Sequence, residues 1–210
     1  MTAQIRSSHC RRIGIESQSG QLEAASMRSC MHTCPVHLFV AVDLPVPIVR
    51  LMRSLPRPAR QGLRWTTPAQ WHVTLRFLGK VDEPNAVAEA LSSIPTSLHA
   101  GTVEARLGPA TAWFPNGRVF HVPVTGVETL AGVVHDATSR WGQYEEPAFA
   151  GHVTLARFRG PDSGPADIAG TPIAAHFEVP EVVLYASSLG SEGATYEVVS
   201  KVPITTARGT

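Results

Sequence analysis

Two copies of the tetrapeptide His-Val-Thr-Leu carry the side chains best suited to chemistry. The first copy starts at His72 and the second at His152, 80 residues later. Similar residues follow each copy: Arg-Phe-Leu-Gly after the first, and Arg-Phe-Arg-Gly after the second, where Ala156 is one extra residue. A histidine and a threonine two residues apart on a strand point the same way, about 7 Å apart along the chain. Each copy thus offers one group that exchanges protons near neutral pH and one hydroxyl that donates to an anionic oxygen.

The doubling of the motif indicates a particular reaction. A two-fold relation between the copies would place two imidazoles on either side of one anion, held by the hydroxyls of Thr74 and Thr154. One imidazole, when neutral, can deprotonate a water, and the other, when protonated, can give a proton to the departing oxygen on the opposite side. This arrangement suits in-line displacement at phosphorus. The symmetry of the pattern leaves open which histidine is the acid.

A metal site is the first alternative for these histidines. Neither copy has a second histidine, a cysteine or a carboxylate at ligand spacing, so we expect no metal and no cofactor. A strained 2′,3′-cyclic phosphate is already activated and would need none. The other histidines have no partner motif and are expected to be structural: His9, His32, His37, His99, His121, His135 and His176.

Composition limits the partners and the compartment. The net charge of the 210 residues is +1, which argues against coating of long nucleic acid but allows binding of an end. No apolar run approaches the roughly 18 residues of a membrane span, and no secretory signal is visible. All three cysteines lie in the first 34 residues. We expect a cytoplasmic monomer with no membrane contact and no protein partner.

The remaining pattern predicts an α+β fold. Apolar alternation and turn residues predict strands at 36–44, 63–65, 71–78, 102–107, 118–124, 152–158, 176–187 and 194–203. Amphipathic spacing predicts helices at 47–55, 84–94 and 129–141. The order of strands and helices recurs in both halves, which predicts two pseudo-symmetric lobes, each a small, mainly antiparallel sheet backed by helices, with a central cleft.

Residues 35–206 should form this bilobal domain. Residues 1–34 are rich in Ser, Arg and Gln without periodicity, which predicts a disordered extension, and 207–210 should be a tail. Two other interpretations of 1–34 stay open. It could be a basic interaction tail, or a start-site artefact with Met27 or Met31 as the true start.

Alternation also predicts which side chains face the cleft. It puts His72, Thr74 and Arg76 on one face of the first repeat strand, and Val73, Leu75 and Phe77 on the face that packs on helices. Arg76 could equally solvate the strand end. We expect Arg64, Arg118 and Arg159 to be surface charges, and Trp65, Trp113 and Phe114 to be packing residues rather than base-stacking platforms.

Several phrases of the sequence resemble those of one family. They are FVAVDLP near the start, LRW before the first repeat, HVTLRFLG, GHVTLARF, and the closing VVLYASSLGSEGATYEVV. From about Val36 to Pro203 the chain resembles the two-histidine (2H) phosphoesterases, and within them the RNA 2′,3′-cyclic phosphodiesterases, also named 2′-5′ RNA ligases. The doubled motif carries most of this resemblance.

The resemblance implies an activity and a role for each motif residue. It implies metal-independent hydrolysis of an RNA-terminal 2′,3′-cyclic phosphate to a 2′-phosphomonoester, with reversible 2′-5′ ligation as a secondary reaction. His72 aligns with the proton donor to the leaving 3′ oxygen, and His152 with the acceptor that activates water. Thr74 and Thr154 align with phosphate-binding hydroxyls, and Arg157 with an arginine that contacts the phosphate region.

Arg157 poses a geometric problem for this assignment. Strict alternation from His152 puts Ala156, not Arg157, on the cleft face, so a β-bulge near Ala156 is needed to turn Arg157 toward the anion. Two alternative functions also stay open. One is a 2H phosphodiesterase that acts on small cyclic nucleotides or 2′-5′ linkages, and the other is a non-catalytic module that binds RNA ends.

Overall fold

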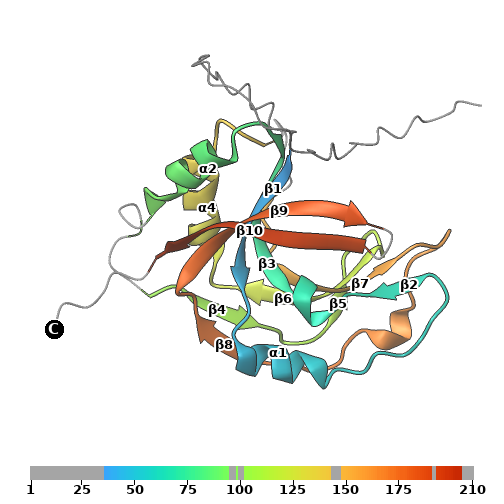
Figure 1. The fold of residues 1–210 in the computed structure, drawn as a ribbon. Helices are drawn as coiled ribbons and strands as arrows, with labels where there is room; N and C mark the ends of the chain where they lie inside the picture. The colour runs from blue at the N-terminus through green and yellow to red at the C-terminus, as the bar shows by residue number, and fades with distance from the viewer. Residues whose placement is uncertain (1–35, 95–97, 99–101, 143–147, 191–192, 205–210) are drawn as a thin grey trace, which may run out of the picture. The chain divides into compact units, whose positions relative to one another are not determined.

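The computed structural model describes residues 36–94, 98, 102–142, 148–190 and 193–204 (Figure 1). The chain divides into two units, Met1–His32 and Thr33–Thr210, and the fold below is that of the second. The expected extension 1–34, with all three cysteines, and the expected tail 207–210 lie outside the described residues. None of the helices in the described part has the length and hydropathy of a membrane span.

Strands dominate the described part, and every strand pair there is antiparallel. The path through the sheet runs β10-β9-β1-β3-β7-β6-β4-β8, with β2 added beside β7 and β5 beside β6. The strands are β1 Val36–Asp43, β2 Leu63–Trp65, β3 His72–Val81, β4 Glu104–Leu107, β5 Ala112–Trp113, β6 Val119–Thr125, β7 His152–Phe158, β8 Ala175–Glu178, β9 Glu181–Gly190 and β10 Gly193–Pro203. The helices are α1 Val46–Arg53, α2 Pro84–Leu91 and α4 Glu128–Ala137. The fold is α+β, as expected.

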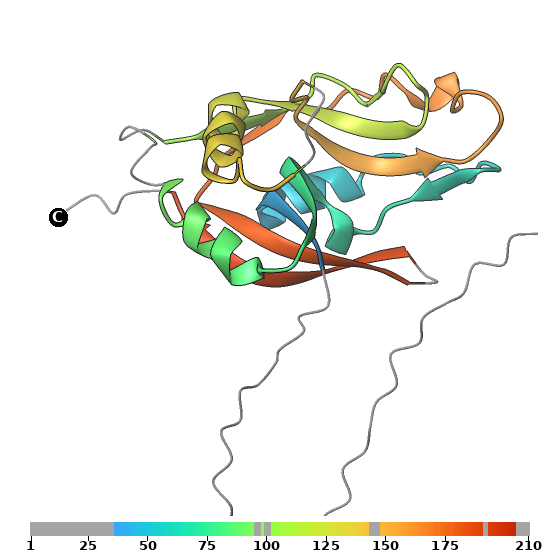
Figure 2. The same cartoon turned by 90° about the horizontal axis from the view of Figure 1, so that it is seen from above.

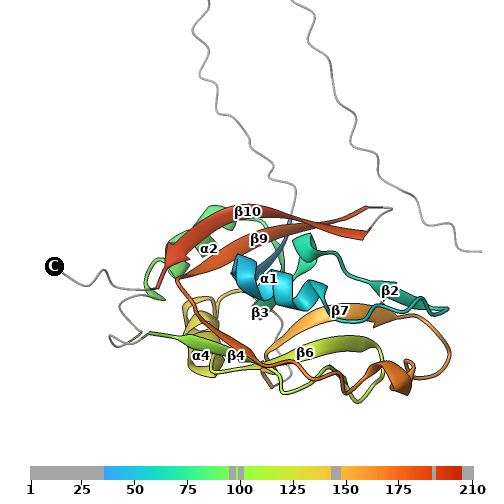
Figure 3. The same cartoon turned by 90° about the horizontal axis from the view of Figure 1, so that it is seen from below.

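Two lobes meet where β3 touches β7. Val73 pairs there with Val153, the same position in each repeat. Outward from this point, β1, β9 and β10 follow β3, while β6, β4 and β8 follow β7. In Figure 2 the β6–β7 pair lies above and the β9–β10 pair below, and Figure 3 shows the same separation from the other side.

The lobes are not the two halves of the chain, which corrects the expectation that element order recurs along the sequence. The C-terminal hairpin β9–β10 returns to the first lobe, where β9 pairs with β1. The predicted strand 176–187 is in fact two strands, since Pro180 lacks the N–H that a continuous ladder needs. Before this break β8 pairs with β4, and after it β9 joins the other lobe.

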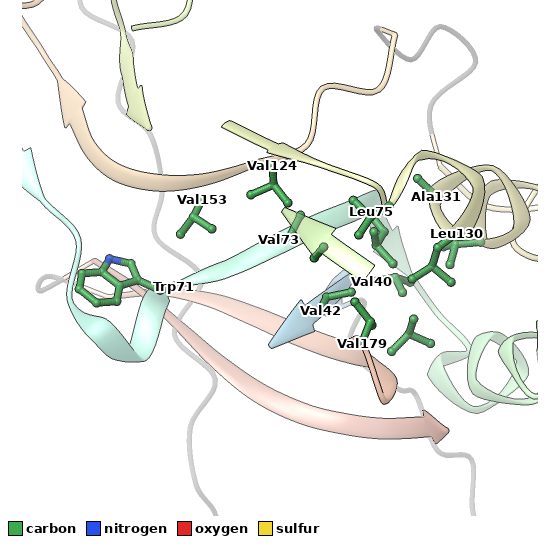
Figure 4. Packing of buried hydrophobic residues seen from close by; sticks show 14 of the residues in the cluster. Val40, Val42, Trp71, Val73, Leu75, Val124, Leu130, Ala131, Val153 and Val179 are labelled. Carbon is green, nitrogen blue, oxygen red and sulfur yellow. The ribbon is translucent and has the colours of Figure 1, made fainter. Parts of the chain in front are cut away.

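Alternation explains how the repeat strands build the core. Val73 and Val153 are buried, and so are Leu75 and Leu155, whereas the motif histidines and threonines are half-buried. Helix α4 packs on β3, and α2 packs on β10 and α4. Figure 4 shows Val73, Leu75 and Val153 in this apolar cluster together with Leu130 and Ala131 of α4. Burial of one face therefore fixes which way the polar motif residues point.

Candidate active site

Each repeat strand carries a β-bulge at its motif leucine. In β3, Thr74 pairs with Ala41 and Arg76 with Val40, so Leu75 has no opposite residue. In β7, Thr154 pairs with His121 and Ala156 with Phe120, so Leu155 has none. A bulge adds one residue to one strand and reverses the alternation that follows it.

The bulge in β7 is the one that Arg157 requires, placed at Leu155 rather than at Ala156. Beyond it Ala156 is fully buried, and Arg157 is exposed and lines a cavity with the two motifs. The matching bulge in β3 was not predicted. Because both copies bulge at the same place, the extra residue of the second copy does not cause the bulge.

The bulge in β3 overturns the predicted faces of Arg76 and Phe77. The Arg76 side chain lies in the interior, with 5% exposure for the residue, and Phe77 is 63% exposed and lines the cavity. The structural equivalents across the two lobes are therefore Arg76 with Ala156 and Phe77 with Arg157. Equating the two arginines by sequence alone is wrong by one residue.

Both motifs open into one cavity of about 670 Å³. It is lined by His72 and Thr74 from β3, and by His152, Thr154 and Arg157 from β7. An antiparallel register through Val73 and Val153 sets His72 opposite Thr154, and Thr74 opposite His152. The two histidines are then diagonal neighbours, with Cα atoms about 7–8 Å apart. Both imidazoles line the same cavity, which has room for a tetrahedral anion.

Backbone carbonyls two residues upstream hold the imidazoles. The Nδ1–H of His152 donates to the carbonyl of Ala150 at 2.8 Å, which leaves Nε2 as the nitrogen with a free lone pair. The His72 ring is likewise hydrogen-bonded to the backbone of Gln70. The pseudo-two-fold relation between the two repeats thus includes the backbone groups that orient the two imidazoles.

Aromatic rings flank both histidines. The His72 ring lies 4.8 Å from Phe39 and 5.1 Å from Tyr196, measured between ring centroids. The His152 ring lies edge-on to Phe114 at 4.8 Å and 5.6 Å from His121. Phe39, Phe114 and Tyr196 line the cavity, so Phe114 does more than the packing we predicted. Such contacts restrict the rotamers of both imidazoles.

His121 is the one unassigned histidine beside the motifs in the described part of the chain. It is buried, pairs with Thr154 in the ladder, and stacks on Phe114 with centroids 4.1 Å apart. Its ring centroid lies 5.6 Å from that of His152, and its structural role stays a prediction. Its neighbourhood could not be read from sequence, because it depends on the pairing of β6 with β7.

Thr66 supports the bulge in β7 and was missed in the sequence. Its single O–H is shared between the carbonyls of Thr154 at 2.7 Å and Leu155 at 2.9 Å, and its oxygen accepts from the Trp71 indole N–H. These bonds satisfy carbonyls next to the bulge, where the regular ladder is interrupted. Thr66 therefore helps to fix the backbone that carries Thr154.

Burial makes both imidazoles weak bases in the free protein. Removal from water is the largest cause that lowers the pKa of His72 to about 4, and the charges of His152 and Arg157 act in the same direction against the hydrogen bond to Gln70. Burial is also the main cause that lowers the pKa of His152, with Arg157 adding to it. A bound anion would oppose these shifts, because it favours the charged imidazolium. The site is thus arranged to gain protons when an anion enters.

Positive charge gathers at one end of the cavity. Arg64 of β2 and Arg159, just beyond β7, are exposed as expected, and both line the cavity together with Arg157. No aspartate or glutamate is among the described residues that line the cavity. Within the described ranges, no three His, Cys, Asp or Glu side chains form a group that could hold a metal ion. The cavity therefore offers cationic and hydroxyl groups, which suit the binding of an anion.

Comparisons with known proteins agree with this geometry. Residues 40–106 match the family model described as LigT like Phosphoesterase. The crystal structure of TT0787 from Thermus thermophilus is similar with a TM-score of 0.66 and 27% identity, covering 82% of this chain and 100% of that one.

LigT from E. coli gives a similar result. Its crystal structure with 3′-AMP has a TM-score of 0.62 and 27% identity, and the match covers 82% of this chain and 99% of that one. A search of curated proteins found no significant match. Over residues 40–106 of its sequence and over most of its fold, the chain is therefore similar to the LigT-like phosphoesterases.

Proposed function

We propose that this phosphoesterase hydrolyses the 2′,3′-cyclic phosphate at the end of an RNA or oligonucleotide to a 2′-phosphomonoester without a metal. The observation that carries the proposal is the pair of motif histidines facing one cavity from equivalent strands. Each is hydrogen-bonded to the backbone two residues upstream. Ligation of 2′-5′ ends would be the reverse of the same reaction.

The proposed mechanism uses the two imidazoles in turn. Nε2 of His152 takes a proton from a water, whose oxygen forms the new bond to phosphorus. The bond from phosphorus to the 3′ oxygen breaks on the opposite side, and His72 gives that oxygen a proton. The hydroxyls of Thr74 and Thr154 and the guanidinium of Arg157 would hold the non-bridging oxygens. After one turnover His152 has gained a proton and His72 has lost one. Transfer of one proton from His152 to His72 through solvent restores the starting state.

Solved relatives support a nucleotide as the substrate. LigT from E. coli has been crystallised with 3′-AMP and with NADP⁺, at 27% and 26% identity to this chain. Both ligands contain a ribose and a phosphate. The cavity described here combines aromatic rings with anion-binding groups, a combination that suits a nucleoside carrying a phosphate.

A product assay tests this function. An oligonucleotide ending in a 2′,3′-cyclic phosphate is incubated with the protein in EDTA, and the products are separated to distinguish 2′- from 3′-phosphate. We expect many turnovers and a 2′-phosphate. Binding without turnover would favour a non-catalytic RNA-end module, and a 3′-phosphate product would contradict the assignment of the leaving oxygen.

The lowered pKa values predict an acidic optimum for kcat/KM. Activity needs one proton on the pair, and this state is most populated between the two pKa values of the free protein, both of which are lowered from 6.5. We expect a bell-shaped profile with its maximum below pH 6.5 and an alkaline decline of about tenfold per pH unit.

The profile of kcat should be displaced to higher pH than that of kcat/KM. The bound phosphate raises both pKa values, so the singly protonated pair persists to higher pH in the complex. Initial rates between about pH 4 and 9, at limiting and saturating substrate, check both profiles. Coincident profiles, or a kcat/KM maximum above about pH 7, would show that burial and Arg157 do not govern this pair.

A further inference from the structure

Tyr196 of β10 lines the cavity, and the mechanism proposed above gives it no role. Its ring lies edge-on to that of His72, with centroids 5.1 Å apart and an angle of 86° between the planes. It also lies edge-on to Phe39, with centroids 5.0 Å apart. The residue is half-buried and borders the same cavity as both motif histidines. These ring contacts hold the tyrosine beside the imidazole of His72.

The hydroxyl of Tyr196 differs from that of its neighbour Tyr185. Tyr185 donates to Oδ1 of Asp43 at 2.7 Å and does not line the cavity. The Tyr196 hydroxyl makes no hydrogen bond with any other residue of the described ranges. A ligand that fills the cavity displaces water, so this hydroxyl would lose its hydrogen bonding unless the ligand accepts from it.

The charge of Arg157 connects this hydroxyl to the two motif histidines. It acts on Tyr196 and also on His72 and His152, so one guanidinium is within electrostatic reach of all three groups. Burial is the larger influence on the pKa of Tyr196 and raises it above its usual value, against the effect of Arg157. The phenol therefore keeps its proton near neutral pH and can donate it to an anionic oxygen.

Gln70 attaches the strand of Tyr196 to the segment that orients His72. Its Nε2 donates to the carbonyl of Ala194 at 2.9 Å, two residues before Tyr196. The backbone of Gln70 also holds the His72 ring. Hydrogen bonds and ring packing thus fix Tyr196 relative to His72, which lowers the entropy cost of ordering its hydroxyl on a ligand.

We infer that Tyr196 is a phosphate-binding residue, whose hydroxyl donates to one non-bridging oxygen of the cyclic phosphate. This inference rests on the proposed function and deepens it, because it adds a donor from β10 to the hydroxyls of the two repeats. A fixed donor at an oxygen that gains charge as water attacks stabilises the transition state. Tyr196 should therefore contribute to rate.

Tyr196→Phe tests the inference, because it removes the hydroxyl and keeps the ring beside His72. On the dinucleotide ApA ending in a 2′,3′-cyclic phosphate, we expect kcat/KM to fall by about tenfold, the effect of one lost hydrogen bond to a charged group. The Tm should not fall, because the hydroxyl has no hydrogen-bond partner among the described residues.

Sulfur substitution shows whether a non-bridging oxygen is the acceptor. The cyclic phosphorothioate of the same dinucleotide exists as two diastereomers, each with sulfur in place of one non-bridging oxygen. Sulfur accepts hydrogen bonds weakly, so one diastereomer should already lack the contact with Tyr196. Tyr196→Phe should cost less than about twofold on that diastereomer and about tenfold on the other.

Tyr185→Phe is the matched control. It removes a hydroxyl from a ring whose centroid lies 6.3 Å from that of His72, but this hydroxyl donates to Asp43 and the residue does not line the cavity. The substitution should lower the Tm, because Asp43 loses a donor. It should leave kcat/KM unchanged on the oxygen substrate and on both diastereomers.

The outcomes separate this inference from the proposed function. An unchanged kcat/KM in Tyr196→Phe, or an equal loss on the oxygen substrate and both diastereomers, would overturn the phosphate contact while hydrolysis itself stands. If the wild-type protein hydrolyses none of these substrates, the proposed function fails. Calorimetric binding of adenosine 2′-phosphate would then decide the inference: a weaker Kd in Tyr196→Phe would support the contact, and an equal Kd would reject it.

Discussion

Replacing His152 by alanine should lower kcat on cyclic-phosphate RNA by about 10²–10⁴-fold, the contribution of a positioned base, and His72→Ala should have an effect of similar size. The two rings line one cavity. In the proposed mechanism they flank one anion, so each substitution removes half of a single proton-transfer pair. The double variant should therefore be scarcely worse than either single one, because residues that act as a unit are not additive. Single-turnover rates of all three variants measure this.

A substrate with a better leaving group separates the two roles. A nucleoside 3′-phosphodiester of p-nitrophenol releases a phenolate that needs no proton. If His72 is the acid, His72→Ala should recover most of its lost rate on this substrate, whereas His152→Ala should not. His176→Ala, at an exposed histidine on β8, is the control and should keep the wild-type rate. Recovery in His152→Ala instead would exchange the two assignments.

Sequence alone predicts the part of the site that lies within the two repeats. Alternation within His72–Thr74 and His152–Thr154 is local, and burial of Val73 and Val153 fixes its direction, so these four polar side chains face one cavity as expected. The need for a bulge before Arg157 also followed from counting residues along one strand. In these cases the evidence lay within a few positions of the motif.

The other residues of the site are placed by the pairing of strands, which the sequence does not reveal. The bulge at Leu75 exists in the ladder with β1, and its consequence is that Phe77 rather than Arg76 faces the cavity. Phe39 could not be assigned to the site either, because β1 is almost entirely apolar and both of its faces look alike in sequence. Arg64 enters the site through the pairing of β2 with β7, which joins segments far apart along the chain.

Arg76→Met should lower the free energy of unfolding by about 1.5–3 kcal/mol, the usual contribution of hydrogen bonds made by a charged group. The guanidinium donates to the carbonyl of His135 at 2.8 Å, the hydroxyl of Thr138 at 2.8 Å and the carbonyl of Trp141 at 2.9 Å. These acceptors lie at and just beyond the end of α4, where carbonyls lack helical partners and a cation is favourable. Methionine fills similar space but leaves these acceptors without a donor. Urea unfolding followed by tryptophan fluorescence measures the loss.

The adjacent residue provides the control that ties this effect to the bulge. Phe77→Ala removes a ring that is 63% exposed at the cavity, so it should change the free energy of unfolding by less than about 1 kcal/mol. If alternation continued unbroken through Leu75, the order would be reversed, with Phe77 buried against α4 and Arg76 in the cavity. A large loss in Phe77→Ala together with a neutral Arg76→Met would therefore reject the bulge, and with it the equivalence of Phe77 and Arg157 across the two lobes.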